Sequence, residues 1–580
     1  SINRQALTGE EIFHQLMESG EMERLASLMR AHRRIVISGL AGSARALVLA
    51  ALEKKTSRRL VFVARSNREV EEFQADVEFF YCALNGNDSS LSQVVTLPAL
   101  EADPYDGTSP HAEVLEQRAQ ALYGAAKGDA RIILTSIGAL AERTASPDSL
   151  KTAGLILRVG DDMPLELIVD LLIADGYVRQ EPVGAVGEFS LRGGILDVYS
   201  PAHLAPHRIE FFGDTVDSIR EFDPDSQRST GRADESVIIP MREVAVRREE
   251  FITWAEAAKK RWTDERFRRD LRERLAHAER GEAFEGWEFL LPLTRPLRSS
   301  ALDYFKDAVL VIDEPAEIEK RAAELYRYLA DRYHQADEEG SLSLAPDELF
   351  LSADELRTRI DQASRVELRL LGREAAATDD QFNIEGLTLT GVESQPQKLF
   401  LFTIDDVTPD VEMLSRSQRR YNGRVQELAR DLEAEDQTTL FVMPSPGLCE
   451  RVREMLNEYG VTAQLLPSLN SALPEEGILS RRIITVGKPA NGFSLVAASL
   501  SLLTESDVFG QHEIIAPPAR ARKQRRASAF LSDLGDLKVG DYVVHIDHGI
   551  GQFQGLKQIA AAGGPTGNVA AGLERAPAAV

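Results

Sequence analysis

The stretch ISGLAGSARALVLAAL, residues 37–52, follows an apolar run and places a glycine-rich turn ahead of a helical pattern. A phosphate-binding loop, G-x-x-x-x-G-K-[ST], has the same setting, because its backbone N–H groups, lysine and hydroxyl bind phosphates and Mg²⁺. The eight corresponding positions are Gly39, Leu40, Ala41, Gly42, Ser43, Ala44, Arg45 and Ala46. The glycine, lysine and hydroxyl residue that end the motif are therefore replaced by alanine, arginine and alanine.

Short aliphatic runs alternate with helical patterns over residues 34–136. The runs are RIVIS, RLVFVA, VVTL and RIILTS. This alternation predicts a parallel sheet covered by crossover helices, with the glycine-rich turn at the carboxyl end of the first strand, where such sheets bind ligands. One crossover helix is expected to begin at Ser109-Pro110, since a capping residue followed by proline is a common helix start.

The pattern changes between residues 157 and 250. One helical segment, PLELIVDLLIADG, precedes the strand-like pieces FSLRGGILDVYSP, HRIEFFGD and TVDSIREFD. Strands joined by short glycine turns favour an antiparallel meander, so this segment is predicted to be an inserted α+β domain.

The remaining chain predicts an α/β multidomain protein. Residues 251–385 are helical around the strand AVLVIDEP and complete the first domain, and KLFLF, TLFVM, RIITVG and ASLSLLTE predict strands of a second small α/β domain. The predicted parts are 1–156 and 251–385 (first α/β domain), 157–250 (inserted domain), 386–512 (small α/β domain), 513–532 (basic flexible linker) and 533–580 (an incomplete β-barrel). Five basic residues between 520 and 526 leave a DNA contact and a solvated tether open as roles of the linker.

Composition narrows the class of protein. The formal charge of −25 disfavours tight non-specific nucleic-acid binding and favours protein partners. Cys82 and Cys449 are too few for a disulfide framework or a cysteine zinc site, and His545 and His548 would project to different faces of a strand, so no metal is expected. No apolar run reaches the ~18 residues of a membrane span, which predicts a cytoplasmic protein without a membrane partner. The start at Ser1 and the small-residue end suggest a fragment.

Two motifs in the inserted domain carry a family resemblance. RGGILD, residues 192–197, and RIEFFGD, residues 208–214, resemble the module shared by the excinuclease B protein and the bacterial transcription-repair coupling factor (Mfd). The resemblance extends from about residue 30 to 560 and includes DPYDGTSPH, GFSLVAASLSLLTESDVFG and VGDYVVHIDHGIGQF. The last of these resembles the start of the RNA-polymerase-interacting domain, which the excinuclease B protein lacks. A short loop at Asp103–His111 in place of a long DNA-probing hairpin, with the altered phosphate loop, favours the amino-terminal half of the coupling factor.

The resemblance implies transcription-coupled nucleotide excision repair. Family members recognise RNA polymerase stalled at DNA lesions, release it with ATP and recruit the excinuclease A protein. ATP, Mg²⁺ and DNA belong to a motor that would follow the polymerase-interacting domain, and no G-K-[ST] occurs in this sequence, so no cofactor is expected for this chain. Weak or absent binding of the RNA polymerase β subunit is expected, because only about 25 barrel residues, Gly535–Ile559, are present.

Three residues are predicted to bind the excinuclease A protein on the strength of the resemblance: Arg192, Arg208 and Phe212. Even spacing places Arg208, Glu210 and Phe212 on one face of a strand. An alternative stays open, in which Phe212 is a core residue and the arginines pair with Glu210 or Asp197. We expect Arg208→Glu to weaken partner binding and to leave the melting temperature nearly unchanged.

Two hypotheses remain for the nucleotide loop. In the first, the loop is degenerate and structural, Asp313 and Glu314 of VIDEP are a remnant of a Walker B-like strand end, and the chain has no catalytic residue. In the second, the chain is an active ATP-dependent DNA helicase or damage-recognition protein of the excinuclease B type, with Arg45 as a substitute cation and the two carboxylates binding Mg²⁺ and water. The first is favoured, since Ala46 cannot bind Mg²⁺ and the Cβ of Ala44 crowds the turn.

Overall fold

The computed structural model describes residues 12–86, 93–370, 399, 401–402, 408–435, 437–469 and 480–510, together with the backbone of two short strands at 542–545 and 549–552. Residues Ser1–His512 form one compact unit and Glu513–Val580 a second. Among the described helices, none combines the length and the apolar character that a membrane crossing requires.

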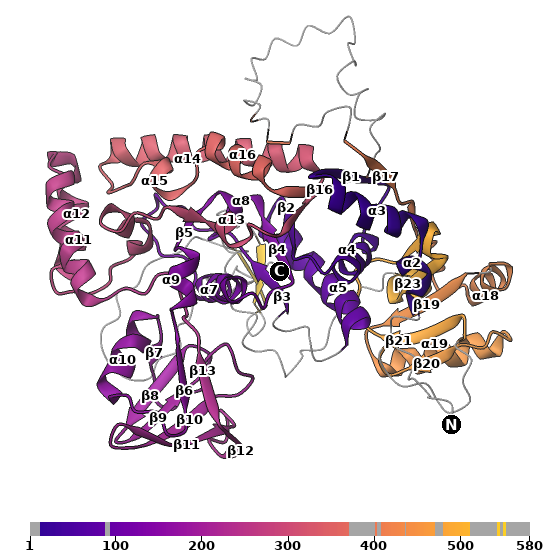
Figure 1. Ribbon diagram of the computed structural model, residues 1–580, viewed down its shortest axis with the longest axis horizontal. Helices are drawn as coiled ribbons and strands as arrows, with labels where there is room; N and C mark the ends of the chain where they lie inside the picture. The colour runs from indigo at the N-terminus through magenta and orange to yellow at the C-terminus, as the bar shows by residue number, and fades with distance from the viewer. Residues whose placement is uncertain are drawn as a thin grey trace, which may run out of the picture. The chain divides into compact units, whose positions relative to one another are not determined.

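A seven-stranded parallel sheet forms the centre of the first unit (Figure 1). The strand order is β17-β1-β16-β15-β2-β4-β3, and every neighbouring pair is parallel. The strands are β1 Arg34–Ser38, β2 Leu60–Ala64, β3 Val94–Leu97, β4 Ile132–Ser136, β15 Val309–Asp313, β16 Ser364–Arg369 and β17 Asp410–Glu412. The predicted parallel α/β architecture is confirmed, and strands from after the inserted domain complete the sheet.

Helices on both sides of the sheet bury its faces. They include α2 His14–Met17, α3 Gly20–Ala31, α4 Ala44–Thr56, α5 Asn67–Asn85, α7 Ala112–Lys127, α8 Ile137–Ala141, α13 Ala301–Tyr304, α14 Pro315–Glu339, α15 Pro346–Leu349 and α16 Ala353–Gln362. Helices α11 Arg248–Arg261 and α12 Arg268–Ala278 pack on each other. The predicted helix start at Ser109-Pro110 is wrong, because α7 begins at Ala112 with His111 as its cap. Ser109 is used elsewhere: its hydroxyl donates to Glu288 at 2.7 Å and accepts from the Gly286 N–H at 2.9 Å.

The inserted lobe is an antiparallel meander with one helix. Its elements are β6 Leu155–Arg158, α10 Leu165–Ala174, β7 Val178–Arg179, β8 Glu188–Arg192, β9 Ile195–Val198, β10 His207–Phe212, β11 Thr215–Phe222, β12 Ser229–Ala233 and β13 Glu235–Ile238. The sheet order is β12-β11-β10-β9-β8-β7, antiparallel from β8 to β12, while β6 pairs with β13. Alternating residues such as Leu196 and Ile209 pack against Ile168 and Leu172 of α10. The meander predicted from the turn-linked strands is confirmed.

A second, mixed sheet follows. It has the order β18-β22-β23-β19-β21-β20 and consists of β18 Ser415–Ser417, β19 Thr438–Met443, β20 Gln464–Leu466, β21 Arg482–Val486, β22 Phe493–Leu495 and β23 Leu500–Thr504, with α18 Val425–Ala434 and α19 Pro446–Glu458. The strand predicted at KLFLF is absent from its described residues 399, 401 and 402. Leu401 is instead buried among the helices that cover the parallel sheet, so this segment packs through side chains rather than through a ladder.

Helix α4 lies between the two sheets. Its residues Ala44 and Ala46–Glu53 are buried all around the helix. One hydrophobic cluster joins α4 to Ile35 and Ile37 of the parallel sheet and to Phe493 and Leu495 of the mixed sheet. A helix that is apolar on every side is stable only when it is covered on every side. The helix that opens at the glycine-rich turn therefore serves as a shared core element.

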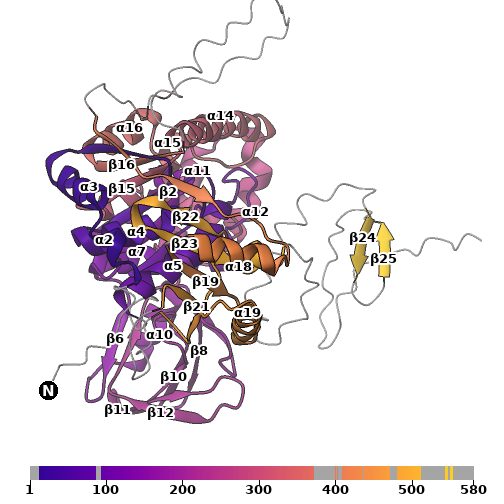
Figure 2. The same ribbon diagram turned by 90° about the vertical axis from the view of Figure 1, so that its right-hand side faces the viewer.

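The second unit contains the described strands β24 Tyr542–His545 and β25 Gly549–Gln552, an antiparallel pair visible in Figure 2. Most of the predicted barrel, the basic linker at 513–532 and His548 lie outside the described residues.

Candidate functional site

The glycine-rich turn connects β1 to α4, where a nucleotide would bind at the carboxyl edge of the parallel sheet. Gly39 has φ +89°, and a Cβ added there would lie 3.1 Å from the Met413 carbonyl oxygen. Only glycine fits this close approach without strain. The turn has thus kept one glycine requirement of a phosphate loop, but the atoms that approach it belong to the same chain.

Polar groups of the turn form hydrogen bonds with Ser415 of β18 and with Asn491, which precedes β22. The Ala41 N–H donates to Ser415 Oγ at 2.8 Å, and the Ser415 N–H donates to the Gly39 carbonyl at 3.0 Å. The Asn491 N–H donates to Ser43 Oγ at 3.0 Å. These bonds occupy two acceptors of the turn and one N–H donor, that of Ala41, which a phosphate-binding loop would leave free for phosphate.

Arg45 forms an ion pair with Asp313, and its Nε donates to the Gly42 carbonyl at 3.2 Å. Its guanidinium also lies over the Phe73 ring, 5.4 Å from the centroid. Burial raises the pKa of Asp313, and the adjacent Arg45 opposes that rise. The cation and the carboxylate that the helicase hypothesis assigns to phosphate and Mg²⁺ are therefore brought together and neutralise each other.

Glu314 also has an internal partner. It caps α14 with φ +49°, and its Oε1 accepts from the Leu370 N–H at 2.6 Å. Burial raises the pKa of this carboxyl as well. No group of three His, Cys, Asp or Glu side chains with metal-binding geometry occurs within the described ranges.

The outer face of the inserted domain brings the other three predicted residues together. Arg208 Nε donates to Asp197 Oδ1 at 2.7 Å and its Nη2 donates to Oδ2 at 2.8 Å. Arg192 Nη2 donates to the same Oδ2 at 2.9 Å. The Asp197 side chain is 1% exposed, so one buried carboxylate holds both arginines in fixed positions at the surface.

Phe212 lies on the same face at the end of β10 and is 85% exposed. His207 and Ile209 point into the domain, which leaves Arg208 and Phe212 outward, as the even spacing predicts. The sequence left open an alternative with two parts. Its pairing of the arginines with Asp197 is confirmed, whereas its placement of Phe212 in the core is wrong.

Two further arginines on this face were missed. Arg220 lies opposite Arg208 on β11, and Arg232 lies opposite Arg220 on β12. Arg220 Nη2 is 3.5 Å from Glu210 Oε2. The alternation in TVDSIREF gives Arg220 an outward position, so it could have been found from the sequence, whereas its alignment with Arg208 depends on the strand register.

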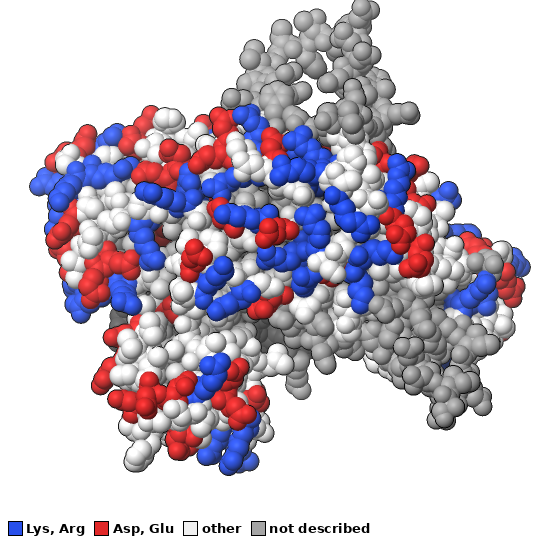
Figure 3. All heavy atoms as spheres, in the orientation of Figure 1, with Lys and Arg blue, Asp and Glu red and all other residues white. Residues whose placement is uncertain are grey.

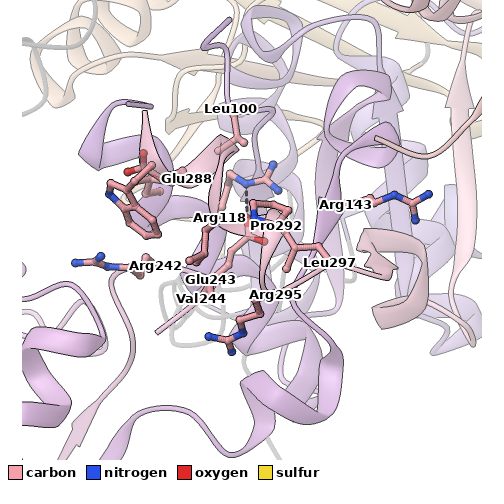
Figure 4. A pocket seen from close by; sticks show the side chains of 13 residues that line it. Leu100, Arg118, Arg143, Arg242, Glu243, Val244, Glu288, Pro292, Arg295 and Leu297 are labelled. Atoms are coloured by element: carbon pink, nitrogen blue, oxygen red, sulfur yellow. Dashed lines mark hydrogen bonds and ion pairs between the residues drawn. The ribbon is translucent and has the colours of Figure 1, made fainter. Parts of the chain in front are cut away.

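A buried ion triad joins the inserted domain to the parallel-sheet body. Arg118 of α7, 1% exposed, pairs with Glu142 and with Glu243, which follows the last strand of the inserted domain. Burial raises the pKa of Glu142 to about 7 despite Arg118. A cavity of about 80 Å³ lies beside the triad, and Figure 4 shows Arg118 next to Glu243 while Arg143 points away. No pattern in the sequence indicated this triad.

Comparisons with known proteins match most of the chain. Residues 155–243 match the UvrB interaction domain, residues 432–508 match the MFD D3 domain, and residues 537–567 match the CarD-like/TRCF RID domain. A transcription-repair-coupling factor of Myxococcus xanthus is 30% identical over 93% of the chain and 44% of its own length. The chain belongs to the transcription-repair-coupling factors. Those of Escherichia coli and Bacillus subtilis are each 24% identical, over 94% and 90% of the chain and 44% and 42% of their own lengths.

Within this coupling-factor family, the chain corresponds to the amino-terminal half and spans less than half the length of the relatives it matches. Arg192, Arg208 and Phe212 all lie inside the UvrB interaction domain match. The glycine-rich turn lies outside the three matched segments. The family resemblance drawn from the sequence motifs is confirmed.

Proposed function

We propose that this chain provides the part of a coupling factor that recruits the excinuclease A protein during transcription-coupled repair. The observation that carries the proposal is the exposed Phe212 beside arginines held by Asp197, in a domain that matches the UvrB interaction domain. An aromatic anchor next to arginines is the usual composition of an interface hot spot. Because Asp197 positions both guanidinium groups before binding, little side-chain entropy is lost when the partner docks.

In this proposal the inserted domain binds the partner. The glycine-rich turn is a degenerate phosphate loop that binds no nucleotide. Arg45, Asp313 and Ser43 already have partners within the chain, which supports the structural hypothesis over an active helicase of the excinuclease B type. Release of stalled RNA polymerase with ATP and Mg²⁺, and motor-driven contact with DNA, are assigned to the part of the full-length relatives beyond this match. Contact with the RNA polymerase β subunit is assigned to the complete RID domain of the full-length relatives; this chain matches that domain over residues 537–567, and weak or absent polymerase binding is expected of it.

Isothermal titration of the full chain with the excinuclease A protein tests the proposal. A saturable isotherm is expected at physiological salt. Adding Mg-ATP to the calorimeter cell should not change this isotherm. The Phe212→Ala variant should weaken it, while the chain should give no heat with an unrelated protein of similar charge as a control. Absence of binding by a chain that is folded by circular dichroism would refute the recruiting role.

A further inference from the structure

A second charged surface lies at the amino edge of the parallel sheet, where α3, α4 and α7 end and β1, β2 and β4 begin. Residues 30–34 and 54–59 contain seven Lys and Arg and no Asp or Glu, although the chain carries a charge of −25. Figure 3 shows Lys and Arg side chains gathered across the middle of one face of the molecule. We call six residues at this edge the basic edge: Arg30, Arg33, Arg58, Arg59, Lys127 and Lys306.

Internal interactions account for only part of the basic edge. Arg58 donates to the Met29 carbonyl at 3.4 Å and Arg59 to the Ala125 carbonyl at 3.2 Å, in the last turns of α3 and α7. Such contacts stabilise helix carboxyl ends. None of the six forms an ion pair with an acidic side chain in the described part of the chain, and Arg30, Arg33 and Lys306 are exposed. Helix capping therefore leaves exposed positive charge unexplained.

We propose that the basic edge binds the phosphate backbone of double-stranded DNA without regard to sequence. Four strand spacings of about 4.8 Å separate β1 from β4, so the row extends about 19 Å, or roughly five to six base-pair steps. The cations lie at helix ends and just before strands of one sheet, and this arrangement fixes their spacing. A polyanion with regularly spaced charges fits such a row.

The surroundings of the basic edge favour duplex DNA over other partners. The exposed large hydrophobic side chains of the described residues all lie outside 30–34, 54–59 and 127–131. A protein interface would need an apolar or aromatic anchor at its centre. Single-stranded nucleic acid would need exposed aromatic rings on which bases stack. Charge without either feature is the composition of a backbone contact.

Fluorescence anisotropy of a labelled duplex of about 30 base pairs with the full chain at about 50 mM salt tests the proposal. The wild-type chain is expected to bind two unrelated sequences equally, with affinity falling steeply as salt rises. The double variant Arg30→Glu, Arg33→Glu is expected to lose about tenfold or more in affinity and to lower the salt slope by about two. Lys127→Glu with Lys306→Glu provides a second, independent pair with the same expected direction.

The matched control is Arg269→Glu with Arg272→Glu on α12, which carries the same charge change on exposed residues and lies at the opposite end of Figure 1 from α3. It should retain affinity within about twofold. A further variant tests the contribution of the linker. It carries Gln in place of Arg520, Arg522, Lys523, Arg525 and Arg526 and should still bind DNA through the basic edge. Wild-type affinity in both edge variants, loss of all binding in the linker variant, or displacement of DNA by polyglutamate at equal charge would each overturn the proposal.

Discussion

Arg208 and Asp197 are joined by two parallel hydrogen bonds, Nε to Oδ1 at 2.7 Å and Nη2 to Oδ2 at 2.8 Å. Arg192 donates to the same carboxylate, so three charged side chains from β8, β9 and β10 form one unit. The guanidinium of Arg208 also lies 4.6 Å from the Phe222 ring centroid. Arg208 is therefore both part of the proposed partner face and a partner for a buried charge.

Arg208→Glu is now expected to lower the stability of the inserted domain as well as its affinity for the excinuclease A protein. Two carboxylates would face each other, one of them buried, and breaking such a pair costs about 3 kcal/mol. This changes the expectation, drawn from the sequence, of a nearly unchanged melting temperature. Differential scanning fluorimetry is the measurement, with exposed Arg228→Glu as the control that should melt like the wild type. Equal melting of both variants would contradict the shared-carboxylate account.

Phe212→Ala should leave the melting temperature unchanged and weaken binding of the excinuclease A protein by about 2 kcal/mol, or roughly thirtyfold. The ring is 85% exposed, so the folded domain loses little packing when it is removed. Leu204→Ala is the matched control, because Leu204 is 87% exposed in the same domain. Calorimetry that finds equal losses for the two variants would show that Phe212 is no special anchor.

Mg-ATP is expected to produce no thermal shift in the wild-type chain, and Arg45→Ala is expected to destabilise it. Removing Arg45 leaves buried Asp313 without its ion-pair partner, and burial already raises the pKa of that carboxyl. Asp313→Asn in the same background should recover part of the loss, since it removes the stranded charge. A nucleotide-dependent shift that Arg45→Ala abolishes would instead restore the helicase hypothesis.

Arg118→Met should destabilise the chain by about 3–5 kcal/mol, because it leaves Glu142 and Glu243 buried without their shared cation. Limited proteolysis should then cut more readily near residue 243, where the inserted domain rejoins the body. Arg68→Met provides the control: Arg68 pairs with Glu72 but is 86% exposed, so a change below about 1 kcal/mol is expected. If both variants behave alike, the triad does not stabilise the junction.

Stability of the inserted domain should fall as the pH drops from about 6.5 to 4. Burial lowers the pKa of His207 to about 4, and neighbouring His203 acts in the same direction. Between these pH values the unfolded chain binds a proton at His207 that the folded domain excludes, so protonation favours unfolding. Melting curves of the wild type and His207→Gln at several pH values measure the effect; the variant should lose less stability on acidification, and parallel curves would rule the effect out.

Much of the fold could be predicted from local sequence pattern. Aliphatic runs such as RIVIS and alternating segments such as HRIEFF specify strands because burial follows their period, and this pattern also placed Arg208 and Phe212 outward. The predictions of a helix start at Ser109 and of a strand at KLFLF were wrong, because these residues make tertiary contacts instead. Ser109 forms a hydrogen bond with Glu288, and Leu401 packs in the helical core.

The sequence by itself determined the succession of strands and helices along the chain, the family motifs and the loss of the lysine and hydroxyl from the glycine-rich turn. Only the tertiary structure decided the partners of the charged and polar groups: Arg45 meets Asp313 across 268 positions, and Ser43 meets Asn491 across 448. A periodic pattern records which side of a strand or helix is buried, because that depends on residues a few positions apart. The identity of a distant partner depends on how strands from separate parts of the chain are ordered in a sheet, and no local pattern contains that order.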